Sequence, residues 1–303
     1  MKLNRGHKGI LLSAAAILAS VVFLILPQRS HFPELPNPNG YDVLVREAAR
    51  ITHHSSILKE MTSNQLAGLV ATNEAVVRAV RKALSLPSVV PVEMREEWLT
   101  SQMTNSMNLR GSANAMDAEA SLSRQRGDST NAMALYLDQV RLGHSMMRGG
   151  LLINFMIGSA SETLAVRRMT NLLSELNAEQ CKQAVRFLEE IDSQRDSFEE
   201  ISARELEWQR KTYSVFVRLN EGFKKHVLRQ TDPISALANA LVGDPEKKYG
   251  LRTLEVRRLL LKLAARAYEL ETGSRPSELS KLIPSYLKAI PRDPTTGSPL
   301  DLP

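Results

Sequence analysis

Six histidines are the first candidates for metal-binding or acid–base chemistry in this 303-residue sequence. They are His7, His31, His53, His54, His144 and His226. None lies in an HExxH motif, and no Glu-x-x-His pair is present to build a di-iron helix bundle. Adjacent His53 and His54 would point about 100° apart on a helix and would not chelate one ion. His144 follows Gly143, where a helix C-terminus would favour a cation. The sequence therefore predicts no metal ligand.

Nucleophiles and acid pairs are the next candidates for chemistry. No Gly-x-Ser-x-Gly elbow is present, and the Gly-Ser-Ala-Ser run at 158–161 is typical of small-residue packing. The Arg-Gly-Gly run at 148–150 lacks the spacing and the lysine of a phosphate-binding loop. Glu199 with Glu200, or Glu205 with Glu207, could support acid–base chemistry. They lie in a charged helical stretch with Asp192, Arg195, Asp196 and Arg204, which favours a solvated face. We therefore predict no catalytic and no cofactor-binding residue.

Cys181 and Asp293 complete the set of chemically capable residues. Cys181 is the only cysteine, so no intramolecular disulfide can form, and its helical context predicts a small buried residue. Asp293 could contribute to a calcium site, but Thr295 and Thr296 stand where further acids would be needed. An Asp-Pro turn is the favoured interpretation.

The elements that would position these residues begin with an apolar N-terminal run, Gly9 to Leu26. From Ile10 onwards it holds neither charge nor proline, and at 1.5 Å per residue it spans about 25 Å, near the minimum for a bilayer. The bulky residues that follow disfavour a cleaved secretory signal, and the lack of a polar face disfavours a buried soluble helix. We predict a basic cytoplasmic segment at 1–8 and a transmembrane signal anchor at 9–27.

The charge distribution sets the expected orientation and excludes one class of partner. Lys2, Arg5 and Lys8 precede the apolar run and only Arg29 follows it closely, so the positive-inside rule keeps the N-terminus in the cytoplasm. The body would then be periplasmic. The chain has 39 basic and 33 acidic residues; removing these four leaves 35 against 33. That near balance is not the footprint of a nucleic-acid-binding protein.

The remaining 270 or so residues predict an all-α body with a short irregular, proline-rich tail. Residues 28–40 form a proline-rich linker. Residues 41–245 form the helical body and 246–303 a C-terminal module. Helices are expected from 41 to 51, 63 to 84, 92 to 109, 110 to 126, 129 to 147, 148 to 176, 177 past 191 and 254 to 272. A short helix with Pro276 in its first turn would follow.

Two local resemblances and one global one accompany this pattern. The run Gly-Asp-Ser-Thr-Asn-Ala-Met-Ala-Leu-Tyr at 127–136 resembles the turn and second helix of a tetratricopeptide repeat, which implies a helical hairpin over about 110–145. Residues from about 264 to 300, with the Asp-Pro-x-x-Gly-x-Pro run at 293–299, look like the C-terminal segment of type II secretion pseudopilins. The N-terminus departs from that family, because no glutamate occupies the fifth position after Gly9. As a whole the chain resembles bacterial single-pass anchored helical proteins of unassigned activity.

Three functions are consistent with these features. The first is a membrane-anchored, non-catalytic protein-interaction or scaffold module outside the cytoplasm. The second, which depends on the tail, is an accessory component of a secretion or surface-assembly system. The third is an envelope enzyme with an unfamiliar site.

Overall fold

The computed structural model describes residues 30–52, 61–213 and 244–303. The chain divides into two compact units, residues 1–31 and residues 32–303, and the description below concerns the second. The predicted anchor, Gly9 to Leu26, lies outside the described residues, as do His7, His53, His54 and His226. No helix in the described ranges is long and apolar enough to cross a membrane.

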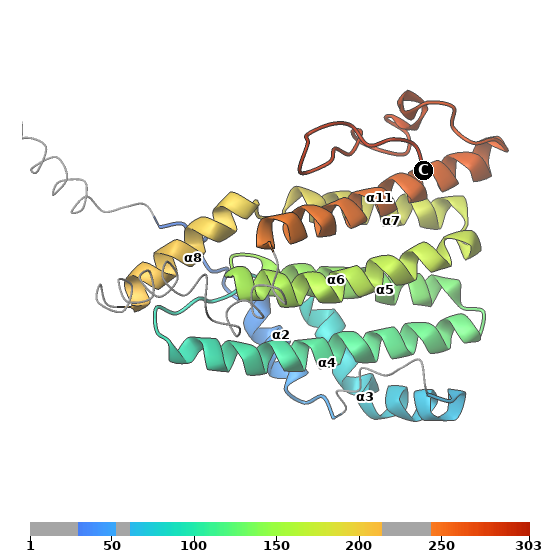
Figure 1. Cartoon of the computed structure of the whole chain (residues 1–303). Coiled ribbons are helices and arrows are strands. Elements are labelled where there is room, and N and C mark those ends of the chain that lie inside the picture. Colours follow the sequence, from blue (N-terminus) through green and yellow to red (C-terminus); the bar gives the residue numbers. More distant parts are fainter. Residues whose placement is uncertain (1–29, 53–60, 214–243) are drawn as a thin grey trace, which may run out of the picture. The chain divides into compact units, whose positions relative to one another are not determined.

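The described part of the body is all-α, as predicted, and forms no β-strand beyond one isolated bridge between Arg292 and Pro299. Its α-helices are α2 (Gly40–Ala48), α3 (Ser63–Ala83), α4 (Glu97–Gln125), α5 (Ser129–Met147), α6 (Leu152–Leu172), α7 (Ala178–Ser193), α8 (Phe198–Thr212) and α11 (Pro245–Thr272) (Figure 1). Two short 3₁₀ helices, η2 (Leu173–Glu175) and η3 (Leu279–Leu282), follow α6 and α11.

From α2 to α6 the helices pack in the order in which they follow one another along the chain, whereas α7 packs on α11 and α5. α3 lies on α4, α4 on α5 and α5 on α6, while α11 covers α7 and part of α6 (Figure 1). The apolar positions of α3 that the helical period selects, among them Leu66, Leu69 and Val80, are buried. Residue 245, where the sequence suggests a division, is the first residue of α11, and both sides belong to one compact unit.

Local side-chain and backbone features mark several helix ends. Asn177 and Gln180 make a reciprocal capping box at the start of α7. The Asp128 carboxylate accepts a hydrogen bond from the Asn131 N–H and so caps α5. Gly273 ends α11 in the left-handed conformation, with φ of +73°.

The two helices predicted over 92–109 and 110–126 are a single helix, α4, of 29 residues. Gly111 lies buried within it and does not break it. One glycine costs a helix about 1 kcal/mol, which buried neighbours such as Leu109, Ala113 and Met116 outweigh by packing. The prediction of a break at Leu109 was therefore wrong.

Glycines bring α5 and α6 into close contact. A Cβ atom at Gly158 would lie 2.6 Å from the carbonyl oxygen of Gly143, so neither helix could carry a larger residue there without moving. Gly143 is therefore a packing residue inside α5 and not a helix cap. The predicted helix over 148–176 begins only at Leu152, because Gly149 has a φ of +73°. Ala160, predicted to pack closely, is exposed.

The segments before α2 and after α11 pack on the helices. Phe32 packs against the core, and the Asn39 side chain exchanges two hydrogen bonds with the backbone of Val89. This part of the predicted linker is thus attached to the body. The predicted helix after Arg275 is reduced to the 3₁₀ turn η3, and Leu287 and Leu300 anchor the tail in the core.

Candidate functional site

The most deeply buried ion pair of the described body joins Glu162 on α6 to Arg195 after α7. Their side chains are only 1% and 5% exposed, and the two guanidinium nitrogens donate to both carboxylate oxygens at 2.7 and 3.1 Å. Burial would lower the pKa of Arg195, but the Glu162 carboxylate more than offsets this and raises it, so the guanidinium stays charged. The predicted solvated face is therefore wrong at this position.

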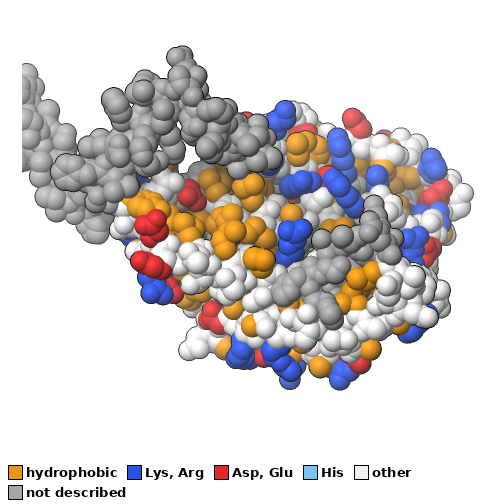
Figure 2. Space-filling view, turned by 60° about the horizontal axis from the view of Figure 1, so that its bottom comes forward, with side chains coloured by type: hydrophobic (Ala, Val, Ile, Leu, Met, Phe, Trp, Pro, Cys, Tyr) orange, Lys and Arg blue, Asp and Glu red, His pale blue; other side chains and the backbone are white. Residues whose placement is uncertain are grey.

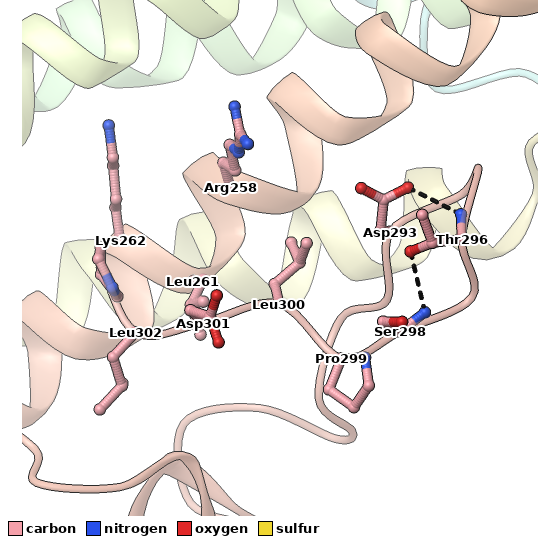
Figure 3. A pocket seen from close by; sticks show the side chains of 11 residues that line it. Arg258, Leu261, Lys262, Asp293, Thr296, Ser298, Pro299, Leu300, Asp301 and Leu302 are labelled. Carbon is pink, nitrogen blue, oxygen red and sulfur yellow. Dashed lines mark hydrogen bonds between the residues drawn. The ribbon is translucent and has the colours of Figure 1, made fainter.

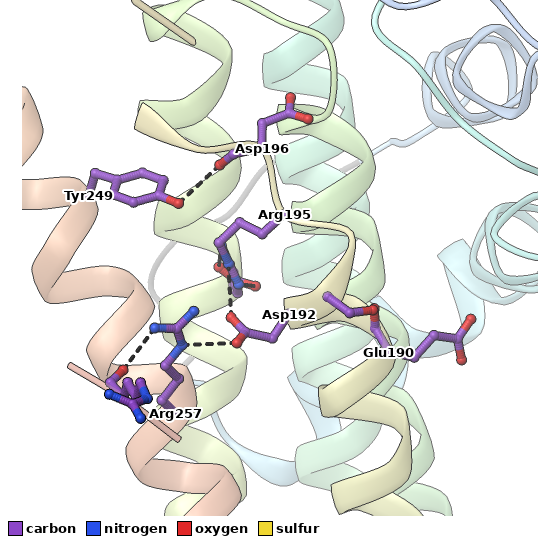
Figure 4. A network of polar contacts seen from close by, with 9 residues as sticks. Glu190, Asp192, Arg195, Asp196, Tyr249 and Arg257 are labelled. Atoms are coloured by element: carbon purple, nitrogen blue, oxygen red, sulfur yellow. Dashed lines mark hydrogen bonds and ion pairs between the residues drawn. The ribbon is translucent and has the colours of Figure 1, made fainter. Parts of the chain in front are cut away.

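A chain of polar contacts extends from this pair across the α7–α11 interface (Figure 4). Asp192 accepts hydrogen bonds from Arg195 at 3.4 Å and from Arg257 of α11 at 2.9 Å. Arg257 also donates to the backbone carbonyl of Arg292 and so attaches the tail. Each charged side chain in this series of contacts has an opposite charge or a carbonyl beside it. This is the arrangement of a structural network and not of a proton-transfer site.

A second arginine of the same stretch is buried beside it. Arg204 of α8 is 3% exposed; it donates to the Asp196 carboxylate at 2.6 Å and to the Gly150 carbonyl at 3.0 Å. Asp196 also accepts the Gly149 N–H at 2.7 Å. The Tyr249 hydroxyl donates to the backbone carbonyl of Asp196 (Figure 4). These contacts hold the α5–α6 loop, α8 and α11 together.

Three of the four glutamates considered for acid–base chemistry make hydrogen bonds or ion pairs that have structural roles. Glu200 caps α8 by accepting the Ser197 N–H, and Glu205 accepts the N–H of Leu152 at the start of α6. Glu207 has a side chain only 9% exposed and pairs with Lys211 at 2.6 Å. Glu199 is exposed. The structure does not bring these four acids together around a cavity.

His144 is buried inside α5 and does not act as a cation at a helix end. Burial, with the nearby Arg195, Arg148 and Arg141, lowers the pKa of His144 to about 3. The imidazole is therefore neutral at physiological pH, and its Nε2 atom has no hydrogen-bond partner. The sequence-based interpretation is corrected because α5 continues through Met147.

The described residues form no site that would suit metal binding or thiol chemistry. Among the described residues, no group of three or more His, Cys, Asp or Glu side chains could hold a metal ion. Cys181 is buried, as predicted, and burial raises the pKa of its thiol to about 11. The Asp293 carboxylate accepts the N–H groups of Thr295 and Thr296, and this confirms the predicted Asp-Pro turn.

A cavity of about 570 Å³ lies between α11 and the tail (Figure 3). Arg258 and Lys262 line it from α11, and Asp293, Leu300 and Leu302 line it from the tail. Figure 3 shows the Asp293 carboxylate engaged by the backbone of its own turn. Acidic, basic and apolar groups are mixed around it without a convergent set, so this cavity suggests no specific chemistry.

A different feature stands out on α4. Leu99, Met103 and Met107 follow one another at intervals of four residues; we call them the methionine face. Met103 is 48% and Met107 62% exposed, and residues 98–109 contain no charged side chain. Figure 2 turns the α3–α4 side forward and shows hydrophobic side chains gathered between charged ones. The absence of charge over three helical turns is visible in the sequence, but which of these side chains are exposed depends on how α4 packs in the fold.

The inner side of α4 is held rigidly beneath this face. The Trp98 indole donates to the Pro91 carbonyl at 2.9 Å, and its ring packs against Trp208 of α8 with centroids 6.4 Å apart. Gln102 donates to the buried Tyr41 hydroxyl. A hollow of about 320 Å³ beside the helix has Tyr41, Trp98 and Gln102 in its lining. The rest of the lining is made by Val45, Pro91, Ser101 and Asn105 and by the charged residues Asp42, Arg46, Glu93 and Arg95. The methionine face therefore stands on a fixed scaffold next to a recess.

No known protein family, curated protein or solved structure matches this chain. The segment with the tetratricopeptide-like pattern does form a helical hairpin, α4 and α5, with Ala132 and Tyr136 buried between helices. Membership of that repeat family, and the pseudopilin resemblance of the tail, remain predictions.

Proposed function

We propose that this protein is a membrane-anchored, non-catalytic interaction module whose helical body binds a partner protein outside the cytoplasm through the methionine face. The observation that carries the proposal is the pair of exposed methionines on an uncharged stretch of α4. Methionine side chains are flexible and polarisable, which suits them to packing against a partner's apolar surface. Exposed apolar residues that cluster on one helix face favour an interaction site.

The geometry of the face favours an amphipathic helix as the bound element. From Leu99 to Met107 the stripe is about 12 Å long, or just over two helical turns. A partner helix would place apolar residues at positions i, i+4 and i+7 along it. Arg95, Glu96 and Glu97 precede the uncharged stretch and Arg110 follows it. Polar or charged partner residues at the rim would meet these groups and set the register.

The location rests on the N-terminal sequence. The uncharged run Gly9 to Leu26 favours a single membrane span, and the excess of basic residues before it favours a cytoplasmic N-terminus. The body would then act in the periplasm, close to the membrane. Protease treatment of intact spheroplasts should digest the body from outside; protection of the body would contradict this orientation.

Site-specific photo-crosslinking in native membranes tests the interaction. A photoreactive amino acid replaces Met107 in the full-length chain, and a matched probe replaces Arg186, an exposed residue of α7. We expect one discrete adduct from position 107 and none from position 186. Mass spectrometry of the crosslinked peptide should show apolar residues at helical spacing in the partner.

The specificity control is a second substitution on the same face. Met103→Glu places a charge in the middle of the stripe without touching the buried side of α4, so circular dichroism should be unchanged and the adduct should disappear. An adduct that persists in Met103→Glu, or that appears equally from both probes, would contradict the proposal. An adduct with a second copy of this chain would show that the methionine face binds another copy of this protein and not a different partner.

A further inference from the structure

Nearly all buried or half-buried arginines of the described residues have a carboxylate partner. Those with such an ion pair are Arg81, Arg168, Arg195, Arg204, Arg252, Arg257 and Arg266. Two half-buried arginines differ, namely Arg141 on α5 and Arg148 at its C-terminal end. In the described part of the chain, neither side chain makes an ion pair or a hydrogen bond. Among the described residues, no carboxylate is therefore bonded to either arginine; the Asp138 carboxylate, which pairs with Arg81, interacts with Arg141 electrostatically at longer range.

Both arginines line the same cavity. It has a volume of about 550 Å³ and lies between the C-terminal half of α5, the end of α7 and the loop after α3. His144 and Ser145 contribute from α5, the exposed Glu190 from α7, and Gln194 from the residue that follows α7. Figure 4 shows Glu190 pointing away from the Asp192–Arg257 pair. The volume falls within the usual range for small-molecule sites, about 300–1,000 Å³.

The Arg141 side chain is held in place by a contact within the protein. Arg141 lies 4.4 Å from the centre of the Phe187 ring, a cation–π contact that fixes its guanidinium beside α7. Arg148 lines a much smaller cavity with Arg195 and His144 as well. Seven residues separate Arg141 from Arg148, so they lie about 10 Å apart along α5, nearly on one side of the helix. His144, buried between them, has an Nε2 atom without a hydrogen-bond partner.

We propose that this cavity binds a small organic anion, with Arg141 and Arg148 each receiving one of its carboxylate or phosphate groups. Guanidinium groups bind such groups through paired, charge-assisted hydrogen bonds. The spacing of the two arginines along α5 suits a ligand with two anionic groups, one for each guanidinium, better than a single ion. Ser145 and Gln194 offer uncharged hydrogen-bonding groups, and Glu190 at the rim disfavours a third anionic group on that side.

Isothermal titration calorimetry of the full-length chain in detergent micelles tests this site, with citrate and inorganic pyrophosphate as the probes. We expect saturable binding of at least one probe with a Kd below about 1 mM. Preference for citrate or for pyrophosphate distinguishes a carboxylate from a phosphate ligand. Arg141→Gln and Arg148→Gln should each weaken binding about tenfold or more, because each removes charged hydrogen bonds.

Two further variants make the result decisive. Arg126→Gln makes the same change in net charge at an exposed arginine next to the opposite end of α5, and it should leave binding unchanged. Glu190→Gln removes the acidic rim and should tighten binding; this result does not depend on the arginine variants folding. Absence of binding for both probes, or equal weakening by Arg126→Gln, would overturn the proposal. Neither outcome bears on the methionine face, which lies on α4.

Discussion

Replacing Glu162 by glutamine should be among the most destabilising conservative changes in this protein. The substitution keeps the shape of the side chain but leaves the charged Arg195, 5% exposed, without its closest carboxylate. Breaking one partner of a buried ion pair costs about 3–5 kcal/mol. We expect the lower end, about 3 kcal/mol, since Asp192 remains 3.4 Å from Arg195 and the amide oxygen can still accept one hydrogen bond.

This loss should appear as a lower melting temperature. For a body of this size, about 3 kcal/mol corresponds to about 6–9 °C. The assay is thermal unfolding of the full-length chain in detergent micelles, followed by circular dichroism at 222 nm. Glu179→Gln is the matched control, because Glu179 and Arg186 are 70% and 60% exposed and water screens their pair. We expect no measurable shift for the control.

A double substitution separates the value of the charges from the value of the packing. Glu162→Leu with Arg195→Met removes both charges and should melt closer to the unaltered protein than Glu162→Gln does, because no buried charge is left uncompensated. If Glu162→Gln melts within about 1 °C of the unaltered protein, the buried pair is not what holds α6 to the end of α7, and this reasoning is refuted.

Three further changes test other parts of the description. Gly158→Ala would place a Cβ atom 2.6 Å from the Gly143 carbonyl and should cost about 1–3 kcal/mol, whereas Gly68→Ala, with open space around it, should gain up to about 1 kcal/mol; thermal melts compare the two. His144 has a pKa of about 3 when folded against 6.5 when unfolded, so the unfolded chain binds more protons between these values. Stability should therefore be full above pH 6.5 and fall towards pH 3, by at most about 4–5 kcal/mol from this residue, and the decline should be shallower in His144→Gln when urea titrations are compared; equal slopes would argue against a buried neutral imidazole. Cys181 should resist Ellman's reagent at pH 8 in the folded protein and react on unfolding in urea, because its thiol is buried and has a pKa raised to about 11; rapid reaction without urea would place it at the surface.

Whether a prediction from the sequence is confirmed or corrected depends on how far apart along the chain the interacting residues lie. The helix that begins at about residue 177 and the one that ends at about residue 272 form as predicted, because the capping box of Asn177 and Gln180 and the left-handed Gly273 depend on residues within one helical turn. The helix break predicted after Leu109 is wrong, because packing contributed by other helices outweighs the weak local preference of Gly111. Local chemistry thus fixes where most helices begin and end, but not whether a helix continues through an unfavourable residue.

The sequence by itself determined that the described body is helical and that Cys181 lies inside it, since periodicity and caps are properties of neighbouring residues. Only the tertiary structure decided which charges are buried. Glu162 and Arg195 are 33 residues apart and Asp117 and Arg168 are 51 apart. Nothing in the stretch around Arg195 distinguishes it from a solvated charge, because the energy of a buried ion depends on the partner that the fold brings to it. For the same reason the sequence does not single out Arg141 and Arg148, which the fold places beside one cavity with no ion pair to either side chain among the described residues.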